Sequence, residues 1–291
     1  MTLSLGVDIG GTKIGFCRIG ADFTTEEIGK VPTALMRRGT KLFAEDLARL
    51  IRATAPPGTT RVGLTLNGVL DGGHVAYSSL MGGPVDFPLE DFLRETLGLP
   101  VHVDDDIHAM TLAEAHLGKG GIDRPFAMLN IGTGIGVGYH DANGVLRGVY
   151  GAGLISEIEV YVDELGEFRS LDRTVCGRGL REMALQVTGE PMDGVTVFQR
   201  AAAGDADAGR IVSIFARHLG DVLKMISRFY HPQVIVLNGS ISRAADQYLD
   251  AALKRYHAGI ESAFRADIAV SALKHAAELG TLVAVSDEVG R

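Results

Sequence analysis

The sequence predicts a mixed α/β protein with two similar lobes and a central cleft between them. The chain has 291 residues, enough for two compact lobes that each bury a hydrophobic core. Patterns typical of strands and of helices alternate along its length. A strand that enters a glycine-rich turn occurs twice, near residues 3–13 and 126–136, and this weak internal repeat indicates two related halves.

The composition is that of an ordinary globular protein, with 46% hydrophobic and 22% charged residues. The net charge of −8 and the lack of a basic run argue against nucleic acid or a membrane surface as a partner. No apolar run reaches the roughly 18–20 residues that span a bilayer, and the first residues lack a signal-peptide pattern, so we expect a cytoplasmic protein. Cys17 and Cys176 fit neither a disulfide framework nor a zinc spacing.

Short apolar runs and helical spacing of apolar residues define the elements of the first half. In chain order they are strands at 3–7 and 14–19, a helix at about 42–54, a strand at 61–66, a helix at 88–97, a strand at 101–103 and a helix at 107–117. Pro88 fits the first turn of the second helix, because the missing N–H of proline costs little there. Glycines punctuate residues 67–84 and predict turns in this stretch.

The second half follows a similar order. It is predicted to contain two strands joined by the turn at 132–136, an Asn143-Gly144 hairpin, two helical regions of which the second spans about 206–230, a strand at 234–237, a helix at 244–256, a strand at 268–271 and a helix at 275–284. We assign residues 1–107 to a smaller N-terminal lobe and 108–273 to a larger C-terminal lobe. A C-terminal helix at about 274–291 is expected to pack back on the first lobe.

Three glycine-containing turns each follow a strand. The first two are suited to bind polyphosphate, because backbone N–H groups converge there and no Cβ blocks their approach. The residues of the three turns are Gly10, Gly11, Thr12 and Lys13; Gly132, Thr133 and Gly134; and Asn238, Gly239 and Ser240. Any one of them alone is equally compatible with a tight hairpin that binds nothing. None is a P-loop, and the strand predicted after Gly136 replaces the helix of a dinucleotide-binding fingerprint.

Carboxylates flank these turns. Asp8 precedes the first turn and is placed to reach Mg²⁺ directly or through water, or else to stabilise the turn. Asp104, Asp105 and Asp106 lie between a strand and a helix, where one of them can cap the helix. Three adjacent negative charges are costly unless donors, metal or substrate hydroxyls absorb them. A hydroxyl group has a high pKa, so its attack on a phosphate requires such a carboxylate as proton acceptor.

Taken together, the motifs resemble those of the ROK family of sugar kinases, which have the two-lobed actin-like ATPase (ribonuclease H-like) fold. Residues 8–13 match the first phosphate motif of the family, 132–136 the second, 234–240 the adenosine motif and 99–106 the strand that leads to its Asn-Asp pair. The match runs in order along nearly the whole chain. It implies ATP and Mg²⁺ as cofactors, a small sugar as substrate and a homodimer as assembly.

The resemblance also assigns roles to individual residues. Asp106 takes the place of the catalytic base that accepts the proton of the sugar hydroxyl, usually O6. Glu157 most nearly matches a sugar-binding glutamate, although Glu159 and Val160 stand where the family has glycine and histidine. The three phosphate and adenosine turns bind the nucleotide. The remaining predicted substrate-binding residues are Asp105, Asn67, Gly68 and His108.

Two departures from the family pattern are informative. The cysteine-rich zinc motif of many members is absent, so we predict no structural zinc. Asp105 replaces an asparagine that binds sugar hydroxyls, and a carboxylate can only accept hydrogen bonds. An ammonium near C3 of the sugar would make a charge-assisted bond worth roughly 1.5–3 kcal/mol. This favours kanosamine (3-amino-3-deoxyglucose) and resembles the kanosamine 6-kinases of antibiotic pathways.

Other functions stay open on the sequence alone. The 3-hydroxyl of glucose can still donate a hydrogen bond to Asp105, so a glucokinase is an alternative function. Some ROK proteins are sugar-responsive transcription regulators, but those carry a helix-turn-helix domain before the first phosphate motif, and seven residues precede Asp8 in this sequence. A sugar-binding protein without kinase activity is a further alternative, and some relatives use polyphosphate in place of ATP.

Overall fold

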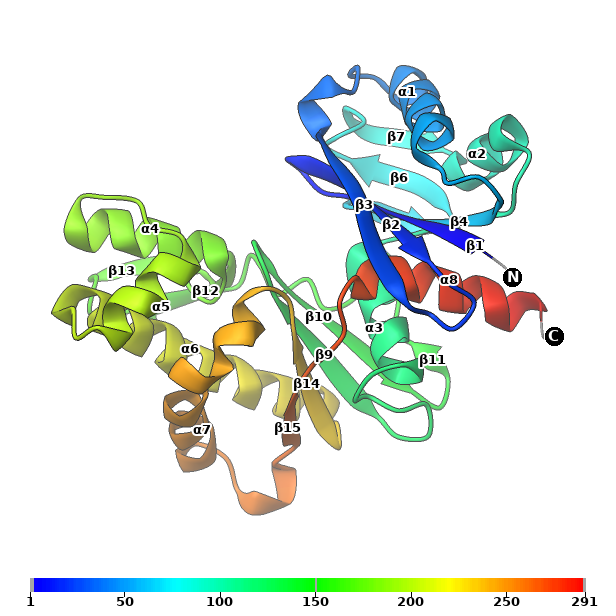
Figure 1. The fold of residues 1–291 in the computed structure, drawn as a ribbon. Helices are drawn as coiled ribbons and strands as arrows, with labels where there is room; N and C mark the ends of the chain where they lie inside the picture. The colour runs from blue at the N-terminus through cyan, green and yellow to red at the C-terminus, as the bar shows by residue number, and fades with distance from the viewer. Residues whose placement is uncertain (1–2, 150, 290–291) are drawn as a thin grey trace. The chain divides into compact units, whose positions relative to one another are not determined.

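The computed structural model describes residues 3–149 and 151–289, and it confirms the mixed α/β class. The chain packs as two compact units, whose elements are labelled in Figure 1. Among the described residues, the first unit runs to Leu117, includes Arg147–Ala152 and resumes at Leu273; the second comprises Gly118–Leu146 and Gly153–Ala272. The predicted lobe limits at 107 and 273 stay predictions. Residues 290 and 291 of the predicted C-terminal helix lie outside the described residues.

The first unit is built on a five-stranded sheet with the order β3-β2-β1-β4-β8. Its strands are β1 (Leu3–Ile9), β2 (Lys13–Ile19), β3 (Thr25–Pro32), β4 (Thr59–Leu66) and β8 (Val101–Asp104). The first three strands are antiparallel, whereas β1, β4 and β8 run parallel to one another. The carboxyl ends of three parallel strands therefore meet at one edge of this sheet.

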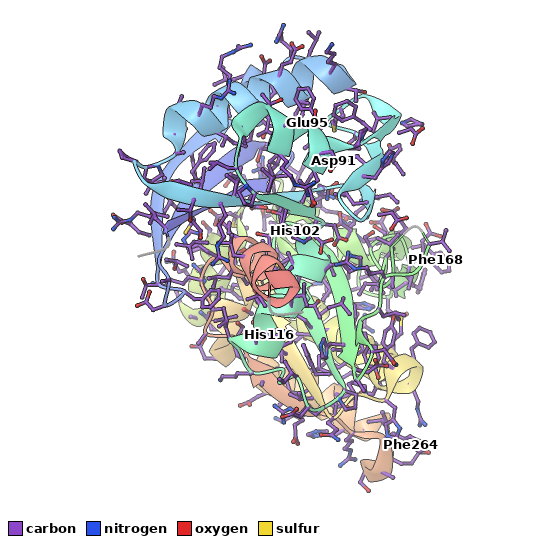
Figure 2. All side chains as sticks on the ribbon, turned by 90° about the vertical axis from the view of Figure 1, so that its right-hand side faces the viewer. Asp91, Glu95, His102, His116, Phe168 and Phe264 are labelled. Carbon is purple, nitrogen blue, oxygen red and sulfur yellow. The ribbon has the colours of Figure 1, made fainter. Side chains whose placement is uncertain are left out.

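Helices cover both faces of this sheet (Figure 1). On one face, α1 (Thr40–Thr54) and α2 (Leu89–Leu97) bury a shared apolar core. Leu89 and Leu93 point into this core, whereas Asp91 and Glu95 lie on the exposed side of α2 (Figure 2). This is the amphipathic pattern of a helix on a sheet.

The opposite face carries α8 (Ala276–Val289), which packs on β1 and β4 and against α3 (Asp106–His116). Glycines make this close packing possible. A Cβ on Gly6 would lie 2.5 Å from Cβ of Glu278, and one on Gly63 would lie 2.2 Å from Oγ1 of Thr281. Helix α8 thus covers strands from the beginning of the chain.

The second unit repeats the sheet order as β11-β10-β9-β14-β15, again with three antiparallel strands followed by two parallel ones. The strands are β9 (Phe126–Ile131), β10 (Ile135–Asp141), β11 (Gly144–Val145), β14 (Val234–Asn238) and β15 (Asp267–Val270). The helices are α4 (Gly177–Thr188), α5 (Gly194–Ala202), α6 (Ala206–Tyr230) and α7 (Leu249–Ala258). The matching order confirms the internal repeat predicted from the sequence.

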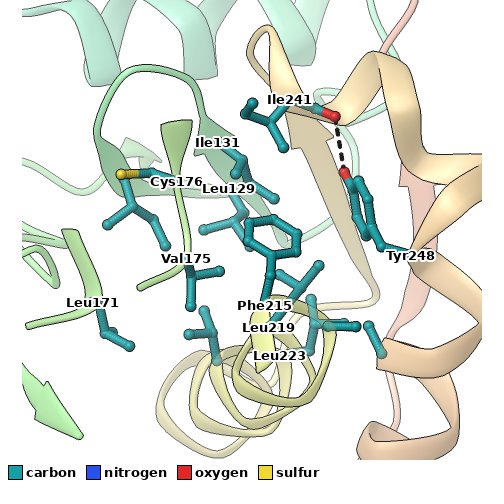
Figure 3. Close-up of a cluster of buried hydrophobic side chains, with 14 of the residues drawn as sticks. Leu129, Ile131, Leu171, Val175, Cys176, Phe215, Leu219, Leu223, Ile241 and Tyr248 are labelled. Carbon is teal, nitrogen blue, oxygen red and sulfur yellow. Dashed lines mark hydrogen bonds between the residues drawn. The ribbon is translucent and has the colours of Figure 1, made fainter. Parts of the chain in front are cut away.

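The core of the second unit forms where α6 packs its apolar stripe against the sheet. Leu129 and Ile131 of β9 face Phe215 and Leu219 of α6 in this cluster (Figure 3). Buried Tyr248 completes it and donates its hydroxyl to the carbonyl oxygen of Ile241 at 3.2 Å. Burial of large aliphatic and aromatic side chains of this kind is the main stabilising contribution to such a unit.

Tyr248 also explains one wrong prediction. Residues 244–256 were expected to form a single helix, but a 3₁₀ segment, Ile241–Gln247, comes first and α7 begins only at Leu249. The backbone of Tyr248 leaves the helical region (φ −137°, ψ −20°) and interrupts the helix, and its aromatic ring is buried in the core.

Several elements were not predicted. They are β3, the small sheet of β5 (Val69–Asp71), β6 (His74–Ser78) and β7 (Gly83–Phe87), and the ribbon of β12 (Glu159–Val162) and β13 (Glu167–Ser170). Phe168 of β13 is exposed and points outward from the ribbon (Figure 2). None of the helices in the described part of the chain combines the length and apolarity needed to cross a membrane.

Candidate active site

In the first unit the predicted site residues gather at the carboxyl edge of the parallel strands. Asp8 of β1 lies beside Thr65 of β4, and Thr65 lies beside Asp104 of β8. The segments that follow these three strands contain the other predicted residues of this unit: Gly10, Gly11, Thr12 and Lys13; Asn67 and Gly68; and Asp105, Asp106 and His108. In open α/β sheets, ligands bind outside the carboxyl ends of the strands.

The first glycine turn (Gly10, Gly11, Thr12 and Lys13) is closed by a hydrogen bond from Gly10 N–H to the carbonyl oxygen of Lys13 at 3.0 Å. Thr33 holds it from behind, since its hydroxyl donates to the Gly10 carbonyl at 2.8 Å and its N–H to the Thr12 carbonyl at 3.0 Å. Gly11, Thr12 and Lys13 are exposed. The turn is thus fixed on its inner side and open on its outer side.

Asp8 is half-buried and accepts a hydrogen bond from Oγ1 of Thr65 at 2.7 Å. Burial, together with the charge of Glu278, raises the pKa of Asp8 to about 6. A cation beside this carboxylate would stabilise its ionised form. Carboxylate oxygens are the ligands that Mg²⁺ prefers, so Asp8 fits the predicted metal role.

Asp105 and Asp106 begin helix α3 and have different surroundings. Asp105 is the N-cap, where Oδ1 accepts from the N–H of His108 at 2.8 Å and Oδ2 pairs with Nδ1 of the same histidine. Asp106 is half-buried and accepts from the N–H of Ile107 at 3.0 Å. Burial, followed by the charges of Asp105 and Asp8, raises the pKa of Asp106 to about 7. Asp106 therefore has the basicity expected of a general base near neutral pH.

A buried ion-pair network lies beneath this acidic pair. Asp104, 2% exposed, binds Arg147 through two hydrogen bonds of 2.7 and 2.6 Å. Hydrogen bonds and charge from Arg147 and His108 outweigh burial and hold the pKa of Asp104 well below its usual range. Burial opposes protonation of His108, but Asp104 and Asp105 outweigh it and raise its pKa to about 9. His108 is thus an imidazolium that neutralises Asp105.

The sequence did not single out Arg147. Its partner Asp104 is 43 positions away, and Arg147 follows a hairpin that belongs to the second unit. The acidic triplet itself was the sequence signal for this network, because three adjacent carboxylates require nearby positive charge or hydrogen-bond donors. Ligand atoms of Asp104, Asp105 and His108 lie within 4.8 Å of one another, and Arg147 supplies positive charge at this cluster.

In the second unit, two of the predicted turns lie side by side. Asn130 of β9 pairs with Asn238 of β14, so the turns that follow these parallel strands occupy the same sheet edge. A Cβ on Gly239 would lie 2.5 Å from the carbonyl oxygen of Ile131, and its φ of +93° also favours glycine. The second glycine turn (Gly132, Thr133 and Gly134) is therefore brought together with Gly239 and Ser240.

Two segments missed as site candidates brace the second glycine turn. The N–H groups of Gly177 and Arg178 donate to the carbonyls of Gly132 and Thr133, at 2.8 and 3.1 Å. Asp172 accepts at Oδ1 from the N–H of Ile135 at 3.3 Å.

Glu157 belongs to the same surroundings but is exposed. Its neighbour Ser156 accepts from the N–H of Asp172 at 3.0 Å, which places this loop next to the brace of the second glycine turn. Buried Cys176 contacts the carbonyl oxygen of Asp172 through Sγ at 2.8 Å. The thiol is therefore part of the packing behind the turn.

Known proteins that are similar to this chain include named sugar kinases. An N-acetylmannosamine kinase of Escherichia coli is 29% identical over 284 residues, covering 95% of each chain. A glucokinase of Halalkalibacterium halodurans is 27% identical, covering 87% of this chain and 85% of its own. Among solved structures, the ROK hexokinase of Thermus thermophilus is 28% identical with a TM-score of 0.73 and 99% coverage of both chains.

A ROK glucokinase of Streptomyces griseus, solved with glucose and AMPPNP, shares the fold with a TM-score of 0.80 at 23% identity, covering 98% of this chain and 99% of its own. These neighbours have the actin-like ATPase fold, as predicted for this chain. A family model described as the ROK family matches residues 4–287. The chain belongs to the ROK family.

Proposed function

We propose that this protein is an ATP-dependent sugar kinase that phosphorylates the 6-hydroxyl of a hexose. One observation carries the proposal. Asp106, a half-buried carboxylate whose pKa is raised to about 7, lies at the sheet edge that also bears Asp8 and the first glycine turn. Relatives named as kinases of glucose and of N-acetylmannosamine support a sugar as acceptor.

The reaction is a direct transfer. The sugar oxygen attacks the γ-phosphorus, the bond from that phosphorus to the β–γ bridging oxygen breaks, and ADP leaves. Asp106 accepts the proton of the hydroxyl as its oxygen bonds to phosphorus. The N–H groups of the glycine turns and the ammonium of Lys13 offset charge on the phosphates. Mg²⁺ would neutralise phosphate charge further, and Asp8 is the residue that would hold it, directly or through water.

The choice of sugar depends on Asp105, for which we propose kanosamine as the candidate substrate and glucose as its rival. Asp105 can only accept hydrogen bonds, which favours a donor such as the 3-ammonium of kanosamine. His108 already pairs with Asp105, however, and relieves the repulsion between Asp105 and Asp106 that an ammonium was expected to relieve. The preference for an amino sugar therefore rests on the carboxylate alone. Proposed further contacts to the sugar come from Glu157, Asn67 and Gly68, and we propose a homodimeric assembly.

The test is a coupled ADP-release assay with ATP–Mg²⁺ against glucose, kanosamine, glucosamine, mannose and N-acetylmannosamine. The Asp106→Asn variant is the matched control, because it removes the base and keeps the size of the side chain. Turnover that depends on both the sugar and Asp106 supports the kinase. Preference for kanosamine over glucose supports the amino-sugar proposal, whereas preference for glucose removes it and leaves the kinase intact. Sugar binding without any turnover would favour a regulator.

A further inference from the structure

Arg178 lies against the second glycine turn and is a cationic residue outside the turn itself. Its N–H donates to the carbonyl of Thr133 at 3.1 Å, so its backbone is fixed to the turn. The turn itself contains no cationic side chain, whereas the first glycine turn contains Lys13. Arg178 therefore places a positive charge beside a turn that has no cationic side chain of its own.

The side chain of Arg178 is oriented by Asp172. Its Nη1 donates to Oδ2 of Asp172, which is 8% exposed. Asp172 is in turn held by the N–H of Ile135, and its own N–H donates to the carbonyl of Ser156. A Cβ on Gly134 would lie 2.8 Å from Oδ1 of Asp172, so this carboxylate lies directly behind the turn.

The ion pair with Asp172 leaves other N–H donors of the Arg178 guanidinium for a ligand. The Arg178 side chain is 53% exposed, although Asp172 is nearly buried. A guanidinium has five N–H donors in a planar fork, and the hydrogen bond to Asp172 engages one of them. The fork matches the oxygens of a phosphate group, which it binds through charge-assisted hydrogen bonds.

We propose that Arg178 binds the polyphosphate chain of the nucleotide in the second unit, with Asp172 as the residue that positions it. This inference rests on the proposed function, because it requires that the second glycine turn binds ATP. Arg178 then supplies in the second unit the positive charge that Lys13 supplies in the first. Adenosine and AMP lack the β- and γ-phosphates and do not use it.

The experiment measures the Kd of the full-length protein for ATP, ADP and AMP by isothermal titration calorimetry. Arg178→Ala is expected to raise the Kd for ATP and ADP by about 10- to 100-fold, the range of one charge-assisted contact. The Kd for AMP is expected to stay unchanged. Arg178→Lys keeps the charge but loses the fork, so it is expected to fall between the wild type and Arg178→Ala.

Arg181→Ala is the matched control, because it removes the same charge from an exposed position on the same helix, α4. It is expected to bind all three nucleotides like the wild type. Equal losses for ATP and AMP in Arg178→Ala would assign the residue a structural role and overturn the inference. Wild-type affinity for ATP in Arg178→Ala would overturn it too while leaving the kinase standing. A wild-type protein that binds no ATP would remove the proposed function and the inference together.

Discussion

The two glycine turns stand on the same scaffold and differ in charge. In the first unit Asp8 pairs with Gly15 across the antiparallel hairpin, and in the second Asn130 pairs with Gly136 at the equivalent point. Both turns close with a hydrogen bond of 3.0 Å between their first N–H and last carbonyl. The sheets that hold them have the same strand order. A carboxylate in the strand before one turn thus corresponds to a neutral amide in the strand before the other.

We expect this difference to give the two sheet edges different chemistry. The first sheet edge concentrates acids, of which Asp8 and Asp106 have raised pKa values and Asp104 is neutralised by Arg147. Acids are what proton acceptance and metal binding require. The second edge has asparagines at the ends of β9 and β14, and neutral amides do not repel phosphates. The repeat gives both units the same strand order, and we expect the different side chains at equivalent positions to give the two sheet edges different roles.

The largest expected effect comes from removing the base on the acidic side. Asp106→Asn should lower kcat by about 100- to 10,000-fold, the usual contribution of a positioned general base. The Kd for ATP should change little, because Asp106 does not belong to the predicted nucleotide-binding residues. Steady-state kinetics and calorimetry measure the two quantities. Activity within threefold of the wild type would assign the base to another residue.

A reciprocal exchange of the equivalent residues tests the comparison directly. Asp8→Asn should reduce kcat/KM by about 100-fold, because a metal contact is worth several kcal/mol, and extra Mg²⁺ should restore part of it. Asn130→Asp should instead raise the KM for ATP by about 10-fold through repulsion of the phosphates. Titrations of both Mg²⁺ and ATP distinguish the variants. Identical profiles would show that the two turns are not specialised.

The pH dependence should report the raised pKa of Asp106. Asp106 must be ionised to accept a proton, so kcat/KM should rise about tenfold per pH unit below pH 7 and level off above it. An ordinary aspartate would already be ionised at pH 5 and would give a flat profile. The profile is measured from pH 5 to 8 with saturating Mg²⁺, and with a buffer control at overlapping pH values.

The smallest expected effect concerns the sugar. Asp105→Asn should shift the ratio of kcat/KM toward glucose over kanosamine by about 10-fold, the lower range for one charge-assisted hydrogen bond. Because His108 pairs with both Asp105 and Asp104, the single variant removes one of the two carboxylates that neutralise this imidazolium. The double variant Asp105→Asn with His108→Asn removes both charges and serves as its control. An unchanged ratio in both variants would exclude Asp105 as the determinant of specificity.

The sequence predicted the parts of the fold and site that are locally encoded. Apolar runs that end in glycine turns identified β1, β9 and β14, and similar turns in both halves predicted the repeat that the strand orders confirm. One residue of the acidic triplet was predicted to cap the following helix, and Asp105 is the N-cap of α3. These features depend on residues close together in the chain, and periodicity reveals them.

Other features depend on distant residues and left no local signal. The pair of Arg147 with Asp104 joins residues far apart in the sequence, and so does the brace of Gly177 against Gly132. Strand β3 escaped prediction because most of its residues are polar or exposed and lack the apolar alternation of a half-buried strand. The charge of His108 was equally hidden, since it arises from two carboxylates that only the fold brings to one imidazole.

The packing of α8 on β1 and β4 also has a consequence for biosynthesis. The ribosome makes β1 and β4 early, but α8 emerges only after all of residues 118–272. Until then, the sheet face at Gly6 and Gly63 lacks α8, whereas the second unit already has its helices α4 to α7. We therefore expect the first unit to begin synthesis first and to complete its folding last. While its apolar strands are still exposed, it is expected to depend most on a chaperone.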